Sequence, residues 1–272
     1  MNRLTTKPMI KTQPKIIVLS GYGLNCEQET AFAFELANGK AEIVHINDLV
    51  DGSKKLSSYQ ILAVPGGFSY GDDTGSGLAY ANKLNNHLRA EIQNFIAKDK
   101  LVIGICNGFQ ILTNLGVLPG ALTFNDNARY TIRWVDLKTT SPEGRPLGSP
   151  WLKGVRKLSL PIAHGEGKYM ADEATLKPLK KNNQIAFQYA KGEICKYQDL
   201  AANPNGALMD IAGVTDATGR ILGMMPHPER AIFFTQSPAW PIMKEKLVRA
   251  GKPLPKYGAG LQIFKNAVNY FK

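Results

Sequence analysis

Long hydrophobic runs are absent from this sequence of 272 residues. No apolar stretch reaches the roughly 18 residues that a membrane-spanning helix needs. Residues 1–15 are polar and basic, so they also lack the apolar segment of a secretory signal. These absences argue against an integral membrane protein, and we expect a cytoplasmic protein that acts without a membrane partner.

Cysteine is scarce, since the chain contains only Cys26, Cys106 and Cys195. An odd number of widely spaced cysteines is not typical of a disulfide-rich protein. No two of them lie at the short spacings that zinc ligands adopt, so we expect no metal site. A single reactive thiol is compatible with this pattern.

Acidic residues are outnumbered, 22 against 33 lysines and arginines, which gives a formal net charge of +11. Such an excess is typical of proteins that bind nucleic acids, and an RNA-binding protein is one hypothesis. The lysines are spread along the chain, however, without an aromatic-interleaved basic motif. We therefore expect no nucleic-acid partner. An acidic protein partner, or a phosphorylated substrate bound to a partner, would account for the positive charge equally well. A salt-dependent RNA-binding assay separates the two hypotheses.

The first half of the chain alternates between strand and helix patterns. Short apolar runs that indicate strands lie at residues 15–20, 42–46, 60–64 and 101–105. Helical patterns follow at residues 25–37, within 77–98, and at 107–115. Nearly continuous apolar strands joined by helices predict a parallel sheet that is covered on both faces. Ligands of such sheets bind beyond the carboxyl ends of the strands.

The second half predicts further strands near residues 129–137, 156–161, 184–189, 208–215 and 221–225, some of them antiparallel. A loop is expected at 141–150, an irregular surface segment at 237–260, and a last helix at 261–271. Together these patterns predict an α/β fold with a mostly parallel central sheet, flanking helices and additional antiparallel strands. We expect one domain over residues 15–272, preceded by a basic tail at 1–14.

Cys106 follows a predicted buried strand and precedes a predicted helix, with Gly104 and Gly108 two residues away on each side. This pattern matches a nucleophile elbow, in which small neighbours permit a sharp turn that presents the nucleophile. The helix N-terminus would favour a thiolate, and the N–H of Asn107 would point toward a developing oxyanion. The alternative is a buried, inert cysteine. Cys26 and the third cysteine lack this context, and we interpret them as structural.

His227 is the best candidate for a base. It follows a predicted buried strand, lies between two prolines, and has Glu229 two residues away to accept from its imidazole. His45 and His87 lie within strand and helix patterns and are interpreted as structural or surface residues. His164 begins the segment His-Gly-Glu-Gly-Lys, whose glycines would allow close approach to a ligand or partner, or simply form a surface turn.

These motifs resemble the class I (triad) glutamine amidotransferases, and among them the glutaminase subunits of phosphoribosylformylglycinamidine synthase. That resemblance covers roughly residues 15–230 and also the terminal helix. It is carried by five segments: Gly-Tyr-Gly-Leu-Asn-Cys-Glu at 21–27, Pro-Gly-Gly-Phe-Ser-Tyr-Gly-Asp at 65–72, Gly-Ile-Cys-Asn-Gly-Phe-Gln at 104–110, Ala-His-Gly-Glu-Gly-Lys at 163–168 and Gly-Met-Met-Pro-His-Pro-Glu-Arg at 223–230.

The resemblance implies a role for each matching residue. Cys106 would be the nucleophile, His227 the general base and acid, and Glu229 its orienter. The other implied site residues are Gly67 and Asn107 as oxyanion N–H donors, Phe68 and Gln110 in the glutamine pocket, and His164 and Glu166 as contacts with the active site or a partner.

The same resemblance implies hydrolysis of glutamine to glutamate and ammonia. Ammonia would pass to a large ATP-dependent synthetase subunit, which converts formylglycinamide ribonucleotide to formylglycinamidine ribonucleotide in purine biosynthesis. A small accessory subunit is also expected. The sequence contains no Gly-x-x-x-x-Gly-Lys-[Ser/Thr] phosphate loop. We therefore expect no cofactor in this chain, with ATP and magnesium on the synthetase.

Two further alternatives remain at this stage. A cysteine hydrolase or chaperone-like member of the same superfamily would commonly carry histidine directly after the nucleophile, where this chain has Asn107. A non-catalytic binding subunit would not need Cys106, His227 and Glu229 together. Covalent labelling of Cys106 by a diazoketone analogue of glutamine would separate these readings.

Overall fold

The structure is a computed structural model that describes residues 13–72, 75–140 and 148–272. Most of the predicted basic tail, residues 1–12, and most of the predicted loop, residues 141–147, lie outside the described residues. No helix in the described ranges has the length and apolar character needed to cross a bilayer.

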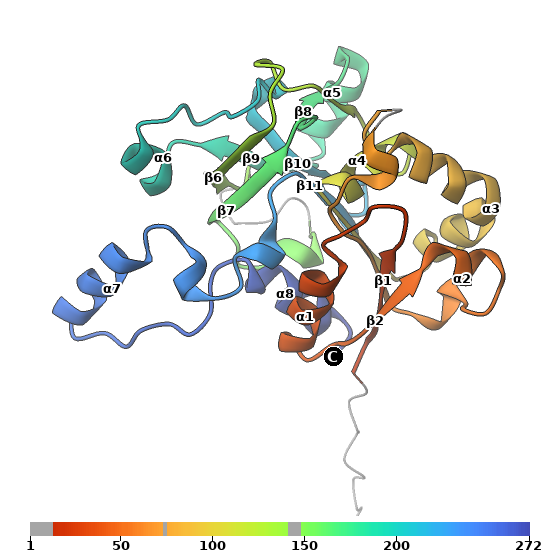
Figure 1. The fold of residues 1–272 in the computed structure, drawn as a ribbon, viewed down its shortest axis with the longest axis horizontal. Coiled ribbons are helices and arrows are strands. Elements are labelled where there is room, and N and C mark those ends of the chain that lie inside the picture. Colours follow the sequence, from red (N-terminus) through yellow and green to blue (C-terminus); the bar gives the residue numbers. More distant parts are fainter. Residues whose placement is uncertain (1–12, 73–74, 141–147) are drawn as a thin grey trace, which may run out of the picture.

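One large mixed sheet forms the centre of the protein (Figure 1). Within the described residues it has nine strands in the order β2-β1-β3-β4-β11-β10-β9-β6-β7. The first five are parallel to one another: β2 (Lys40–His45), β1 (Lys15–Ser20), β3 (Ile61–Val64), β4 (Leu101–Ile105) and β11 (Ile221–Met224). The others join antiparallel: β10 (Ile211–Thr215), β9 (Ile185–Ala190), β6 (Thr131–Lys138) and β7 (Lys157–His164). The predicted α/β class, with a parallel core and added antiparallel strands, is confirmed.

A small antiparallel pair accompanies the large sheet and consists of β5 (Ala121–Thr123) and β8 (Lys168–Met170). The helices are α1 (Glu27–Leu36), α2 (Ile46–Val50), α3 (Leu78–Ile96), α4 (Asn107–Asn114), α5 (Glu173–Lys181), α6 (Glu193–Gln198), α7 (Trp240–Arg249) and α8 (Leu261–Tyr270).

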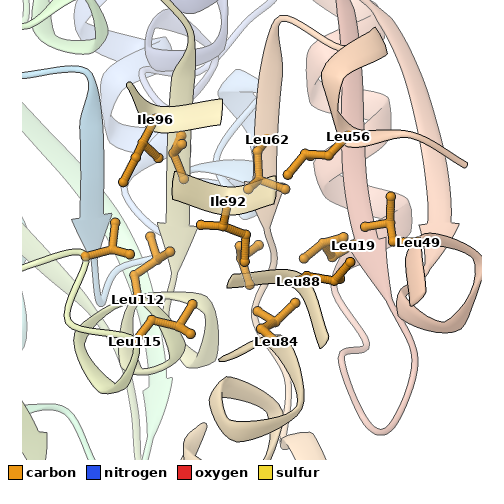
Figure 2. Close-up of a pocket in the computed structure, with 13 residues that line it drawn as sticks. Leu19, Leu49, Leu56, Leu62, Leu84, Leu88, Ile92, Ile96, Leu112 and Leu115 are labelled. Carbon is orange, nitrogen blue, oxygen red and sulfur yellow. The ribbon is translucent and has the colours of Figure 1, made fainter. Parts of the chain in front are cut away.

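Helices cover both faces of the parallel half of the sheet. On one face α1 packs against α8, where Phe34 and Phe264 meet edge to face with ring centroids 4.9 Å apart. On the other face, leucines and isoleucines of α3 and α4 lie over β1, β3 and β4 (Figure 2). Because side chains alternate along a strand, Ile16 of β1 contributes to the first face and Leu19 to the second. The cavity left between these apolar side chains measures about 10 Å³, so this region is packed core and not a ligand site.

The segment 237–260 differs from the expectation of an irregular surface excursion. It contains α7, a ten-residue helix with a proline in its first turn and no buried residue. In Figure 1 this helix projects from the body of the protein. Sequence periodicity did not reveal it, because the helix has no face packed on the core.

Candidate active site

Cys106 occupies a strained turn at the carboxyl end of β4. Its φ is 51° and its ψ is −108°, a conformation that L residues rarely adopt, and it is the residue immediately before α4. A Cβ on Gly108 would lie 1.8 Å from the carbonyl oxygen of Val64, and a Cβ on Gly104 would lie 2.6 Å from that of Gly108. The two glycines are therefore needed because the backbones approach closely, as the elbow pattern predicts.

His227 and Glu229 form a buried pair beyond the carboxyl end of β11. Nδ1 of His227 lies 2.5 Å from Oε1 of Glu229, and the side chains are 2% and 0% exposed. The N–H of His227 donates to the carbonyl of Pro161 at 2.9 Å, which fixes the backbone. Because Glu229 engages Nδ1, Nε2 is the nitrogen left to exchange a proton, and it has no hydrogen-bond partner among the described residues.

The charges around His227 favour its protonated form. Burial alone would lower the pKa of this imidazole, but the Glu229 carboxylate and the Cys106 sulfur raise the pKa well above its ordinary value. The structure thus brings the three residues of the predicted triad together, although they come from two strands far apart in the sequence. A thiol beside an imidazole that holds its proton is suited to form a thiolate–imidazolium pair.

Gly67 and Phe68 lie at the carboxyl end of β3. The N–H of Phe68 donates to the carbonyl of Gly23 at 2.9 Å, and Gly67 adopts φ +158° where a Cβ would lie 2.4 Å from that same oxygen. Phe68 is 42% exposed, and its ring centroid lies 5.7 Å from that of Tyr130. Burial raises the pKa of Tyr130, and Cys106 raises it further. The phenol therefore belongs to the surroundings of the thiol. Sequence analysis did not identify Tyr130.

The side-chain amides of Asn107 and Gln110 take part in internal hydrogen bonds. Asn107 accepts from the N–H of Ser69 at 3.1 Å and donates to Oε1 of Gln110 at 2.8 Å. Gln110 in turn donates to the carbonyl of Glu166 at 2.5 Å. These two amides connect the loop after β3, the elbow and the loop after β7. The backbone N–H of Asn107, as the first in its helix, has no intrahelical acceptor.

The segment that contains His164 and Glu166 lies beside the elbow and contributes mainly backbone. The Cys106 thiol donates to the carbonyl of Ala163 at 3.6 Å. His164 is buried, with Nδ1 3.1 Å from Oδ1 of Asn125, and burial followed by the nearby His227 lowers the pKa of His164 to about 3. His164 is therefore neutral at ordinary pH.

Cys26 and Arg230 complete the surroundings of His227; the sequence analysis interpreted Cys26 as structural and gave Arg230 no role. Arg230 donates through Nη2 to Sγ of Cys26 at 2.9 Å, and its Nε lies 3.9 Å from Oε1 of Glu229. Ligand-type atoms of Cys26, His227 and Glu229 lie within 4.8 Å of one another, the one such metal-sized cluster in the part of the chain that the structure describes. The guanidinium already faces this cluster with a positive charge, which disfavours an additional metal cation.

A signal for Cys26 was present in the sequence. It lies between β1 and α1, directly before the helix, as Cys106 lies directly before α4, and the carboxyl ends of parallel strands meet at one edge of the sheet. A strained cysteine elbow, a buried His–Glu pair and a Gly-Gly loop at that edge define the class of triad glutamine amidotransferases.

Comparison with known proteins identifies the family. The model of the CobB/CobQ-like glutamine amidotransferase domain matches residues 13–271. The phosphoribosylformylglycinamidine synthase subunit PurQ of Methanococcus maripaludis strain C7 is 48% identical over 97% of this chain and 99% of its own length. PurQ of Dehalococcoides mccartyi is 40% identical over 94% of this chain and 97% of its own length. The chain belongs to the CobB/CobQ-like glutamine amidotransferase family and, within it, to the PurQ subunits.

Solved structures agree with this assignment. PurLQS from Thermotoga maritima superposes with a TM-score of 0.70 at 28% identity, covering 96% of this chain and 100% of the matched chain. A glutamine amidotransferase from the same organism, at 14% identity and a TM-score of 0.52, covers 96% of this chain and 98% of its own and shows the shared fold alone.

Proposed function

We propose that this chain is the glutaminase subunit of a phosphoribosylformylglycinamidine synthase, with Cys106 as nucleophile, His227 as general base and acid, and Glu229 as the orienter of His227. The observation that carries the proposal is the meeting of the strained Cys106 elbow with the buried His227–Glu229 pair at one sheet edge. Family membership supplies the substrate, which is glutamine.

The reaction begins with transfer of the Cys106 proton to Nε2 of His227. The thiolate attacks the side-chain amide carbon of glutamine, and the N–H groups of Gly67 and Asn107 stabilise the oxyanion of the tetrahedral intermediate. His227 then protonates the departing nitrogen, which leaves as ammonia. Water, deprotonated by the same imidazole, hydrolyses the glutamyl thioester and releases glutamate and the free thiol. Throughout, Glu229 holds Nδ1 and stabilises the imidazolium.

The glutamine pocket is proposed between the loop after β3 and the elbow. The exposed ring of Phe68 supplies an apolar wall. Gln110 acts from behind, since its side-chain amide is engaged by Asn107 and by the Glu166 carbonyl. The half-buried Glu166 and the backbone around His164 form the rim that faces a partner.

Ammonia is proposed to pass to a large synthetase subunit. The relatives are named as subunits of phosphoribosylformylglycinamidine synthase, and one solved relative is part of PurLQS. The PurL-like partner would bind ATP and magnesium and convert formylglycinamide ribonucleotide to formylglycinamidine ribonucleotide in purine biosynthesis. A PurS-like subunit would be the small accessory component. We propose a cytoplasmic location for this assembly.

The decisive variant is Cys106→Ala, tested in the complex with the synthetase subunits. We expect it to abolish glutamine-dependent synthesis while ammonia-dependent synthesis continues at the wild-type rate, because only the thiol is removed. Cys195→Ala is the matched control, since Cys195 is also buried and its thiol donates to the carbonyl of Ala190 at 3.7 Å. Glutaminase activity retained by Cys106→Ala would overturn the assignment.

A further inference from the structure

A second thiol lies against the base of the proposed triad and has no part in the reaction described above. Cys26 is 1% exposed, and its sulfur accepts from the Arg230 guanidinium at 2.9 Å. That sulfur lies within 4.8 Å of ligand-type atoms of both His227 and Glu229. Its surroundings differ from those of an inert core cysteine, because its neighbours Arg230 and Glu229 carry charges.

The backbone of Cys26 is tied to the loop after β3. Its N–H donates to the carbonyl of Gly66 at 3.1 Å, and its own carbonyl accepts from Oγ1 of Thr30 at 2.7 Å. A Cβ on Gly66 would lie 2.7 Å from Cε1 of His227 and 3.2 Å from Sγ of Cys26. No space therefore remains between the glycine loop, the sulfur and the imidazole, and a movement of any one of them is transmitted to the others.

Arg230 links this sulfur to the carboxylate. Its Nη2 contacts Cys26, and its Nε lies 3.9 Å from Oε1 of Glu229, the oxygen that holds Nδ1 of His227. A guanidinium is planar, so an acceptor at one end restricts the direction of the other end. The contact with the Cys26 sulfur therefore restricts how Arg230 is oriented toward Glu229. Through Arg230 it also restricts how the Glu229 carboxylate is oriented toward His227.

We propose that Cys26 is a positioning residue of the glutaminase site, which holds Arg230, Glu229 and His227 in register with the glycine loop that binds the oxyanion. This inference deepens the proposed function and rests on it. Among the described residues, the titratable groups that act on His227 are Glu229, Cys106, Cys26, His164 and Tyr130, and the charged Arg230 contacts Cys26 and Glu229. Burial lowers the pKa of His227, and against it Glu229, then Cys106 and then Cys26 raise that pKa.

The first test measures glutaminase kinetics of the complex as a function of pH. Loss of one hydrogen bond to a charged group predicts that Cys26→Ala lowers kcat by about 10- to 100-fold. KM stays near the wild-type value, and the basic limb of the pH–rate profile moves to lower pH because His227 loses a group that favours its proton. Cys26→Ser, whose hydroxyl also accepts from Arg230, recovers part of kcat. Cys195→Ala leaves all three quantities unchanged.

A purely space-filling role for Cys26 predicts a different result. Cys26→Ala would then lower the melting temperature as Cys195→Ala does and leave the pH limbs in place, which would overturn the inference. Cys106→Ala is included in the same series. If that variant keeps glutaminase activity, the proposed function itself fails. If it loses activity while Cys26→Ala retains the wild-type profile, only the role of Cys26 fails.

A second measurement needs neither glutamine nor a partner. Iodoacetamide alkylates thiolates, so the rate of Cys106 labelling against pH, followed by mass spectrometry of its peptide, reports the Cys106–His227 pair in the full-length chain. We expect the labelling midpoint of Cys106 to rise in Cys26→Ala/Cys195→Ser relative to Cys195→Ser alone. If the alanine variant does not fold, Cys26→Ser/Cys195→Ser is compared in its place, with a smaller rise expected. Identical labelling profiles would refute the positioning role.

Discussion

Glu229→Gln is the sharpest probe of the His227–Glu229 pair. The substitution keeps the shape of the side chain but removes a carboxylate that is 0% exposed and lies 2.5 Å from Nδ1 of a buried imidazole. Breaking a buried ion pair by removing one partner costs about 3–5 kcal/mol. The glutamine amide still offers a neutral hydrogen bond, so we expect the loss of transition-state stabilisation to lie in the lower part of that range. This corresponds to a fall in kcat of about 100- to 1,000-fold.

The direction of the pH effect follows from the same contact. Glu229 raises the pKa of His227 against the opposing effect of burial, so its removal lets the imidazole lose its proton at lower pH. The basic limb of the glutaminase profile should therefore move to lower pH. The assay is glutamine-dependent synthesis by the complex, with ammonia-dependent synthesis as the internal standard. Glu245→Gln, on the exposed face of α7, is the matched control. A Glu229→Gln enzyme within about threefold of wild type would refute the reasoning.

Two further predictions concern stability. Gly108→Ala places a Cβ 1.8 Å from the Val64 carbonyl and should lower the free energy of unfolding, measured by chemical denaturation, by at least about 3 kcal/mol. In the control Gly165→Ala the Cβ meets only a Tyr130 ring carbon at 3.8 Å, so the free energy of unfolding should stay within about 0.5 kcal/mol of wild type. Equal losses in the two variants would contradict the close-approach argument. The pKa of His164 falls from 6.5 to about 3 on folding, so the unfolded chain takes up a proton below pH 6.5 that the folded chain refuses. This residue therefore supports the fold above pH 6.5 and loses that support as the pH falls toward 3, so the wild type should lose about 3 kcal/mol more than His164→Gln between pH 7 and pH 4; parallel losses would show that His164 is not buried in its neutral form.

Most of the fold was predictable because its signals are local. Apolar runs at residues 15–20, 60–64 and 101–105 form buried parallel strands, and the helices between them begin within a few residues of their predicted positions. The order of the antiparallel strands was not predictable, because β6 pairs with both β7 and β9 and no short hairpin connects it to either strand. Helix α7 was missed because it buries no residue.

The candidate site divides in the same way. The Cys106 elbow depends on residues close to it in the sequence. The glycines two residues away on each side allow the turn, and they can be read directly from the sequence. For Gln110, which was predicted to line the glutamine pocket, we propose a supporting position behind the pocket wall, because its side chain is hydrogen-bonded to Asn107 and to the Glu166 carbonyl. That distinction depends on segments more than fifty residues apart, for which the sequence contains no spacing rule.

The sequence by itself determined the secondary structure of the parallel core, the strained turn at Cys106 and the His227–Glu229 pair, because each depends on residues a few positions apart. Only the tertiary structure decided that Cys26 and Arg230, separated by 204 positions, meet beside His227. The physical reason is the strand order β1-β3-β4-β11, which brings the carboxyl ends of distant strands to one edge of the sheet. Charges and thiols collected there change one another's protonation, and that coupling exists only once the chain is folded.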